Sequence, residues 1–116
     1  MTSTLCLRLA TLNGFLVVAL GAFGAHGLKA VLLAHQTQSV WEKAVLYHMF
    51  HTLVILILAT RPMPPKGAVM FFLLGIVLFS GSLYVLAASN SRWLGAITPI
   101  GGVSFIIGWV LLFLFP

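Results

Sequence analysis

Four long apolar segments, separated by short polar breaks, account for nearly all of this 116-residue chain. They cover residues 9–27, 40–60, 68–88 and 94–115. A helix of about 20 residues crosses the roughly 30 Å hydrocarbon core of a bilayer. Since each segment is close to that length, the pattern predicts an all-α membrane protein. We expect four transmembrane helices in an up-down bundle, forming a single domain over residues 1–116.

Three polar breaks separate the predicted crossings. The clearest is Arg61–Gly67, which contains three prolines that cannot continue a helix. Ser89–Arg92 forms the last break. The longest, Leu28–Gln38, is rich in residues that favour helix. It is expected either to extend the first helix or to form a short interfacial helix of its own.

Local signals refine three of the crossings. Ser39 and Glu42 match a capping box, so Ser39 is expected to cap the second helix. Asn13 lies inside the first crossing and is expected to hydrogen-bond to a neighbouring helix. Pro99 removes a backbone hydrogen bond and predicts a kink in the fourth helix.

Small residues recur in the crossings and predict close approach between helices. The candidate packing residues are Gly14, Gly21, Ala25, Gly75, Gly81, Gly101, Gly102, Ser104 and Gly108.

Aromatic residues suggest a further feature of the bundle. Trp41, Trp93 and Tyr84 are expected near one membrane face as an interfacial belt, with Trp109 towards the other.

Composition agrees with a membrane protein and excludes several functions. Charged residues make up 6% of the chain, against about 25% in soluble domains. The six cations are scattered among the breaks, which favours contact with membrane lipids over binding of nucleic acid. Glu42 is the single acid, so catalytic triads and paired carboxylates are excluded. We therefore expect no enzymatic activity and no cofactor. Cys6 is the single cysteine and cannot form an intrachain disulfide.

Membrane orientation is weakly determined by charge, because three cations are predicted on each side. The compact turn between Arg61 and Lys66 favours both termini in the cytoplasm. The first crossing also has the three regions of a cleavable signal peptide, beginning with Arg8. Cleavage would leave three crossings.

Histidines carry the candidate chemistry. His48 and His51 are three residues apart on the second helix, and His26 ends the first crossing on the same half of the membrane. Ionisable residues at this depth usually face the bundle interior. The candidate buried polar pocket comprises His26, Tyr47, His48, His51, Ser80, Ser82 and Thr98.

Three interpretations of this pocket remain open. The histidines can be neutral and hydrogen-bonded across the bundle to serine, threonine or backbone groups. They can instead line a polar pathway or a ligand pocket. Thirdly, His26, His48 and His51 can bind a transition metal or haem.

Motifs in every crossing resemble the YgdD/YwdK family of small bacterial inner-membrane proteins, which has eukaryotic relatives. The matching stretches are Val18–Gly27, Trp41–Leu53, Leu78–Tyr84, Thr98–Phe105 and Gly108–Trp109. The resemblance implies four transmembrane helices, an intact first segment and a location in the bacterial inner (cell) membrane. It extends to His26 and His51, whereas position 48 varies in the family, so His26 and His51 become the preferred pair. The family's biochemical function is not known, and the resemblance therefore implies no activity.

Two main functional hypotheses follow. The first is a non-enzymatic scaffold or accessory protein that forms a homo-oligomer or binds a membrane-protein partner. The alternative is binding or transport of a small molecule, lipid or ion through a polar pocket around His26 and His51. Haem or metal binding is the third hypothesis.

Overall fold

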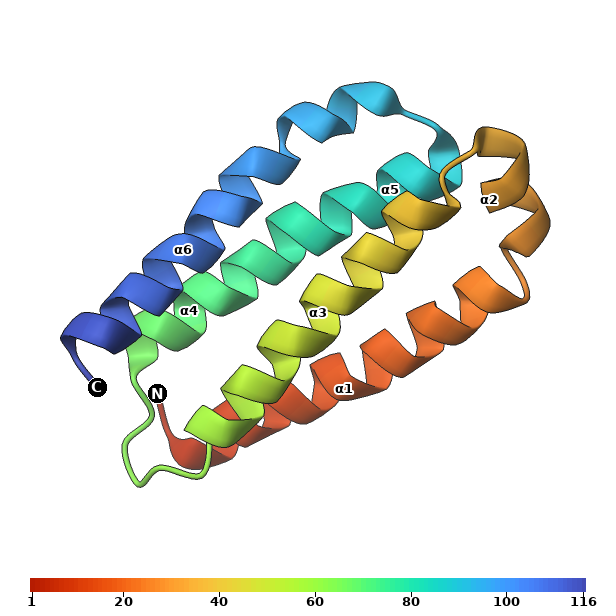
Figure 1. The fold of residues 1–116 in the computed structure, drawn as a ribbon. Coiled ribbons are helices and arrows are strands. Elements are labelled where there is room, and N and C mark those ends of the chain that lie inside the picture. Colours follow the sequence, from red (N-terminus) through yellow and green to blue (C-terminus); the bar gives the residue numbers. More distant parts are fainter.

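The computed structural model describes residues 1–116, all of whose regular elements are helices (Figure 1). In chain order they are α1 (Ser3–Ala25), α2 (Lys29–His35), α3 (Gln38–Leu58), α4 (Lys66–Gly75), the π-helix η1 (Ile76–Gly81), α5 (Ser82–Ser89), the 3-10 helix η2 (Arg92–Ala96) and α6 (Thr98–Leu114). Four helical stretches are long and apolar enough to cross a membrane: Ser3–Ala25, Gln38–Leu58, Lys66–Ser89 and Arg92–Leu114. The predicted all-α architecture with four crossings is confirmed.

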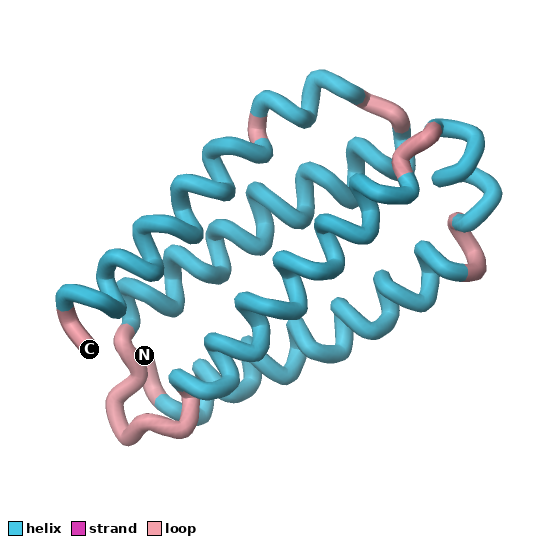
Figure 2. The backbone as a smooth tube through the Cα atoms, viewed as in Figure 1, coloured by secondary structure: helices cyan, strands magenta, loops and turns pink.

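The crossings run up and down, and both termini lie at the same end of the bundle (Figures 1 and 2). Each crossing packs against the one that follows it: α1 on α3, α3 on the third crossing, and the third crossing on α6. The Cα atoms extend over 47 × 26 × 16 Å, so the bundle is wider in one lateral direction than in the other. Side chains join α3 to α6: the imidazole of His51 stacks on Phe105 and accepts a hydrogen bond from Trp109 Nε1.

The first break contains the short helix α2. Of the two expectations for this break, a separate short helix is therefore the one observed. The capping box expected at Ser39 is wrong, because α3 already begins at Gln38 with Thr37 as its N-cap residue. Tertiary contacts decide this boundary. Gln36, the residue that follows α2, adopts a left-handed backbone conformation with φ 56°. The buried Thr37 hydroxyl then donates to the carbonyl of Ala87 at 2.7 Å, which ties the start of α3 to α5.

The third crossing contains a π-helix that the sequence did not predict. It covers Ile76–Gly81, in the middle of the span Lys66–Ser89. On its outer side α6 approaches so closely that a Cβ on Gly101 would overlap the backbone of Leu78 and Phe79. On its inner side the Ser80 hydroxyl donates to the carbonyl of Ala44 at 2.8 Å. The irregular turn is therefore packed between two helices.

The fourth crossing is irregular near Pro99, where the sequence predicted a kink. The 3-10 helix η2 ends at Ala96, and α6 then begins at Thr98 with Pro99 in its first turn. A proline is tolerated there because the first amides of a helix have no intrahelical acceptor. The backbone thus changes from 3-10 to α geometry at the position where the proline predicted a kink.

Four of the candidate packing residues do lie at close helix contacts. A Cβ on Gly75 would overlap the Phe105 ring, and one on Gly108 would lie 2.6 Å from the Phe72 ring. Gly101 meets backbone, as described above, and the Ser104 hydroxyl donates to the carbonyl of Phe71 at 2.7 Å. Together these residues bring α6 against the third crossing.

The other packing candidates contribute less or nothing within the chain. Gly14 has no close contact within the chain, because nothing lies within 4 Å of the position its Cβ would take, and Ala25 is exposed. Gly21, Gly81 and Gly102 have only ordinary contacts, at 3.8 Å or beyond. Gly24 was not predicted as a packing residue, yet a Cβ there would overlap the indole of Trp41.

The expected aromatic belt is wrong for two of its three members. Trp41 and Tyr84 are buried, and their rings pack edge to face with centroids 4.8 Å apart. Trp41 Nε1 donates to the carbonyl of Leu20 at 2.9 Å, which fastens α3 to α1. Of the three, Trp93 alone is exposed, at 69%. Trp41 and Tyr84 face the bundle interior because each has a hydrogen-bond partner there.

Candidate functional site

His48 is buried at the junction of α1, α3 and α5, and both of its ring nitrogens are hydrogen-bonded. Nε2 lies 2.9 Å from Asn13 Oδ1, and Nδ1 lies 3.0 Å from the hydroxyl of Tyr84. Since an amide oxygen only accepts, Nε2 carries the proton and Nδ1 accepts from Tyr84. Asn13 Nδ2 in turn donates to the carbonyl of Leu9 at 2.9 Å. Asn13 thus has its partner on a neighbouring helix, as the sequence predicted.

His51 is also buried, but it faces α6. Its Nδ1 lies 2.8 Å from the carbonyl of Tyr47, and its Nε2 accepts from Trp109 Nε1 at 3.2 Å. The imidazole stacks on Phe105, with ring centroids 3.6 Å apart and planes inclined by 8°. The ring is therefore a neutral tautomer, with its proton on Nδ1.

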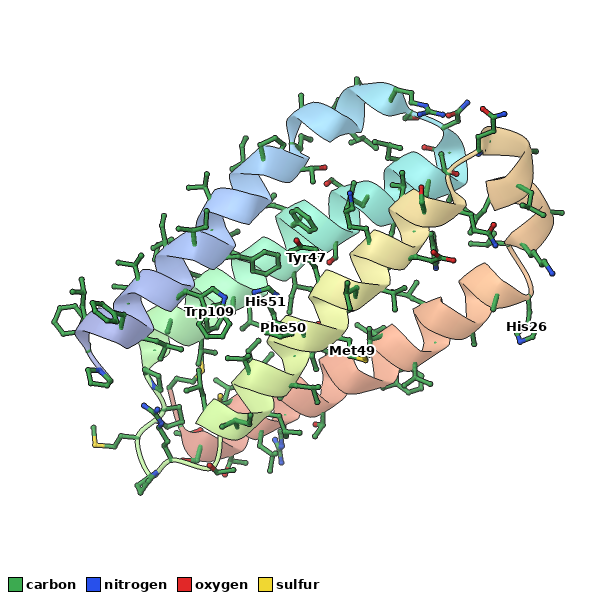
Figure 3. The ribbon with its side chains drawn as sticks, in the orientation of Figure 1. His26, Tyr47, Met49, Phe50, His51 and Trp109 are labelled. Atoms are coloured by element: carbon green, nitrogen blue, oxygen red, sulfur yellow. The ribbon has the colours of Figure 1, made fainter.

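The histidines do not come together as the metal and pocket hypotheses required. His26 is exposed at the end of α1, and Figure 3 shows it at the α2 end of the bundle, away from His51. No three histidine, cysteine or acidic side chains converge on one point. Because His48 and His51 each use both nitrogens within the bundle, the predicted three-histidine site is not formed.

The remaining polar candidates join separate helices. Ser80 bonds to the backbone of α3, as described above. Ser82 Oγ and Thr98 Oγ1 lie 2.7 Å apart and connect α5 to the start of α6. The expected single polar pocket is therefore divided into small hydrogen-bonded contacts. Only Tyr47 and His51 of its seven predicted members line a cavity of substantial size.

That cavity is a groove of about 690 Å³ between α3 and α6, with Phe79 of η1 among its lining residues. Its lining residues are Leu46, Tyr47, Phe50, His51, Phe79, Pro99, Gly102, Val103, Phe105, Ile106 and Trp109. Figure 3 shows Tyr47, Phe50, His51 and Trp109 gathered between these helices. Several of the lining side chains, including Phe50 and Ile106, are exposed on the outer surface of the bundle. The groove therefore opens towards the lipid.

Tyr47 is the polar side chain that distinguishes this groove. Its ring packs against Phe79, with centroids 4.5 Å apart, and it is 40% exposed. Its hydroxyl forms no hydrogen bond within the chain, whereas the Tyr84 hydroxyl is bonded to His48. The groove thus combines aromatic walls with one unpartnered hydroxyl.

The α6 side of the groove was not predicted from the sequence. Gly102, Phe105 and Trp109 are spaced by three and four residues, so they lie along one face of α6. This spacing was the available signal. It indicates an aromatic stripe beside a glycine, although it does not say which helix the stripe faces.

Comparisons with known proteins agree on one family. The model of the family described as "Protein of unknown function (DUF423)" matches residues 20–102. The UPF0382 inner membrane protein YgdD of Escherichia coli K12 is 46% identical over 119 residues, covering 97% of this chain and 88% of the relative. The UPF0382 membrane protein YwdK of Bacillus subtilis is 46% identical over 112 residues, covering 90% and 89%. The UPF0382 membrane protein SSP2132 of Staphylococcus saprophyticus is 51% identical over 110 residues, with the same coverage. No solved structure matches the chain.

Proposed function

This chain belongs to the DUF423 family, whose relatives are membrane proteins, and on that premise we propose that it is a non-enzymatic lipid-phase binding protein. It holds an apolar, membrane-resident molecule in the groove between α3 and α6. The observation that carries this proposal is the groove itself, about 690 Å³ in volume and lined mainly by apolar and aromatic side chains. Ligand sites commonly have volumes of about 300–1,000 Å³ and such linings.

Polar groups of the bundle support binding over catalysis. His48 and His51 are neutral and bonded at both nitrogens, so neither presents a free base to the groove. Ser80 and Ser104 donate to backbone carbonyls and are held away from a nucleophilic role. Nucleophilic catalysis needs a side chain activated by a nearby base.

A location in the cell membrane with both termini in the cytoplasm is part of this proposal. The Escherichia coli relative is named an inner membrane protein, which supports this location. The compact turn with Arg61 and Lys66 lies at the end of the bundle that holds both termini (Figure 1). Positively charged short loops favour the cytoplasmic side. Reporter fusions at either terminus test this orientation, and periplasmic activity at both would reverse it.

Co-purification tests the binding proposal. The protein is extracted from its native membrane in polymer-bounded lipid discs, and the molecules in the discs are compared by mass spectrometry with a bulk membrane extract. Gly102→Leu fills the groove, while Gly14→Leu adds the same side chain where nothing lies within 4 Å of the Cβ position. We expect one molecule to be enriched with the unaltered protein and with Gly14→Leu, and lost with Gly102→Leu. Discs of bulk composition for all three proteins would contradict the proposal.

A second candidate is an accessory protein that docks another membrane helix or a second copy through α1. The observation that favours it is the unused small-residue side of this helix: Gly14 has no close neighbour, and Ala25 is exposed. Gly21 lies on the same side and contacts only Val45, at 3.8 Å. Small residues on one side of a helix allow close approach of another helix. Cysteine crosslinking from position 14 in native membranes should then trap a defined partner or dimer, and a strict monomer would reject this role.

A further inference from the structure

We infer that the groove between α3 and α6 selects a lipid-soluble quinone, whose ring carbonyl accepts a hydrogen bond from the Tyr47 hydroxyl. This inference rests on the proposed binding function of the groove and names the class of molecule bound. Three observations carry it: the state of the Tyr47 hydroxyl, its depth in the membrane, and the shape and lining of the groove.

The hydroxyl of Tyr47 differs from the comparable donors around it. Tyr84, Trp41 and Trp109 each donate to a partner within the chain. The Tyr47 hydroxyl has none, although its ring is packed against Phe79 in a lining that is otherwise mostly apolar. A donor without a partner in hydrocarbon is unfavourable, so a ligand that brings an acceptor to this point is favoured.

Depth decides which molecules can supply that acceptor. Tyr47 lies nine residues after Gln38 and eleven before Leu58, so it is near the middle of α3, roughly 14 Å from the start of the helix. The polar atoms of a phospholipid lie at the edge of the core, about 15 Å from its centre. An acyl chain therefore brings only methylene groups to Tyr47. The acceptor must belong to a mainly apolar molecule that carries a polar atom inside the core, as a quinone does.

The shape of the groove favours a planar small molecule over a transmembrane helix. On α6 the lining runs from Pro99 to Trp109, ten residues or about 15 Å, which is half of a crossing. A docked helix would need a contact along most of the crossing. The walls carry the rings of Tyr47, Phe79 and Phe105, and such rings pack well against the face or edge of another flat ring.

Quenching of Trp109 fluorescence by a defined quinone tests the inference. The protein is placed in phosphatidylcholine nanodiscs with increasing mole fractions of a benzoquinone carrying two isoprene units. Comparison with Trp109→Phe isolates the signal of this indole from those of the other tryptophans. We expect quenching that saturates, with a midpoint three- to tenfold higher for Tyr47→Phe, the change that loss of one hydrogen bond produces. Gly102→Leu and Val103→Phe, two independent ways to fill the groove, remove the saturable part, and Gly14→Leu retains it.

The outcomes separate this inference from the proposed function. An unchanged midpoint for Tyr47→Phe, or saturation that survives both groove-filling variants, overturns the quinone assignment. Absence of saturable quenching in the unaltered protein also overturns it. If the co-purification experiment still finds a molecule that Gly102→Leu displaces, the binding function stands with a different ligand. If neither experiment detects a bound molecule, both proposals fail.

Discussion

Gly101→Ala is the substitution for which the structure makes the sharpest prediction. In α6, Gly101 faces the π-helix η1, and an added Cβ would overlap the backbone of Phe79 and lie 2.7 Å from the carbonyl carbon of Leu78. Ordinary contacts of a Cβ begin at about 3.4 Å. Because these are backbone atoms, they cannot rotate aside as a side chain can. Relief therefore requires α6 to shift away from the third crossing by several tenths of an ångström or more.

The expected effect can be worked out from three contributions. Overpacking of this kind destabilises by about 1–3 kcal/mol, and backbone overlap places Gly101→Ala towards the upper end. Loss of the bond from Ser104 to the carbonyl of Phe71 adds about 0.6 kcal/mol if α6 moves. The higher helix propensity of alanine offsets about 1 kcal/mol of this destabilisation. The free energy of unfolding should therefore fall by roughly 2 kcal/mol.

The neighbouring residue supplies a matched control. A Cβ on Gly102 would meet only the ring of Phe79, at 3.8 Å, so Gly102→Ala should be neutral or stabilise by up to about 1 kcal/mol. Unfolding in mixed micelles, followed by circular dichroism as the denaturing detergent is increased, measures both variants. Gly101→Ala should unfold well before the unaltered protein and Gly102→Ala should not. Equal stability of the two variants would refute the close backbone contact at η1.

Three further predictions concern the hydrogen bonds. A double-mutant cycle of Asn13→Ala and His48→Ala should give a coupling energy of about 0.6 kcal/mol, because the two side chains are hydrogen-bonded at 2.9 Å. Additive effects of the two substitutions in the same unfolding assay would argue against that bond. Tyr84→Phe should destabilise the fold by up to about 1 kcal/mol because it removes the donor to His48. Tyr47→Phe should leave the stability unchanged because its hydroxyl has no partner in the chain, so a clear loss of stability would show an intrachain bond.

The sequence predicted the crossings well because their lengths match the membrane and their breaks are chemically distinct. Three prolines lie in the break that follows the second crossing, and helix-favouring residues form α2 within the longest break. Asn13 was expected to find a partner on another helix because an unpaired amide in hydrocarbon is unfavourable, and it bonds to His48. These predictions depend on single residues and on lengths, which are explicit in the sequence.

The rotation of each helix could not be predicted, and the site depends on it. In a membrane, both the core side and the lipid side of a helix are apolar, so hydrophobic periodicity does not mark the buried side. His48 and His51 are neighbours on α3, yet the first turns to α1 and α5 and the second to α6. His26 matches the family resemblance but lies exposed beyond these contacts, so its part in the predicted pocket was wrong.

Irregular backbone was the other source of error. The π-helix at Ile76–Gly81 forms where a glycine of α6 meets its backbone, and this contact joins residues more than 20 positions apart. No local signal in the third crossing specifies it. Phe79 of this π-helix and Gly102 of α6 both line the groove, so the irregular turn forms part of its wall.

Photocrosslinking from within the groove tests the central claim most directly. A diazirine analogue of leucine replaces Val103, which lines the groove, and in a separate sample it replaces Val18, an exposed residue of α1 outside it. After irradiation in native membranes, mass spectrometry identifies the attached molecules. We expect one non-phospholipid adduct of defined mass at position 103 and a mixture of bulk phospholipids at position 18. The same phospholipid mixture at both positions would contradict a selective binding groove.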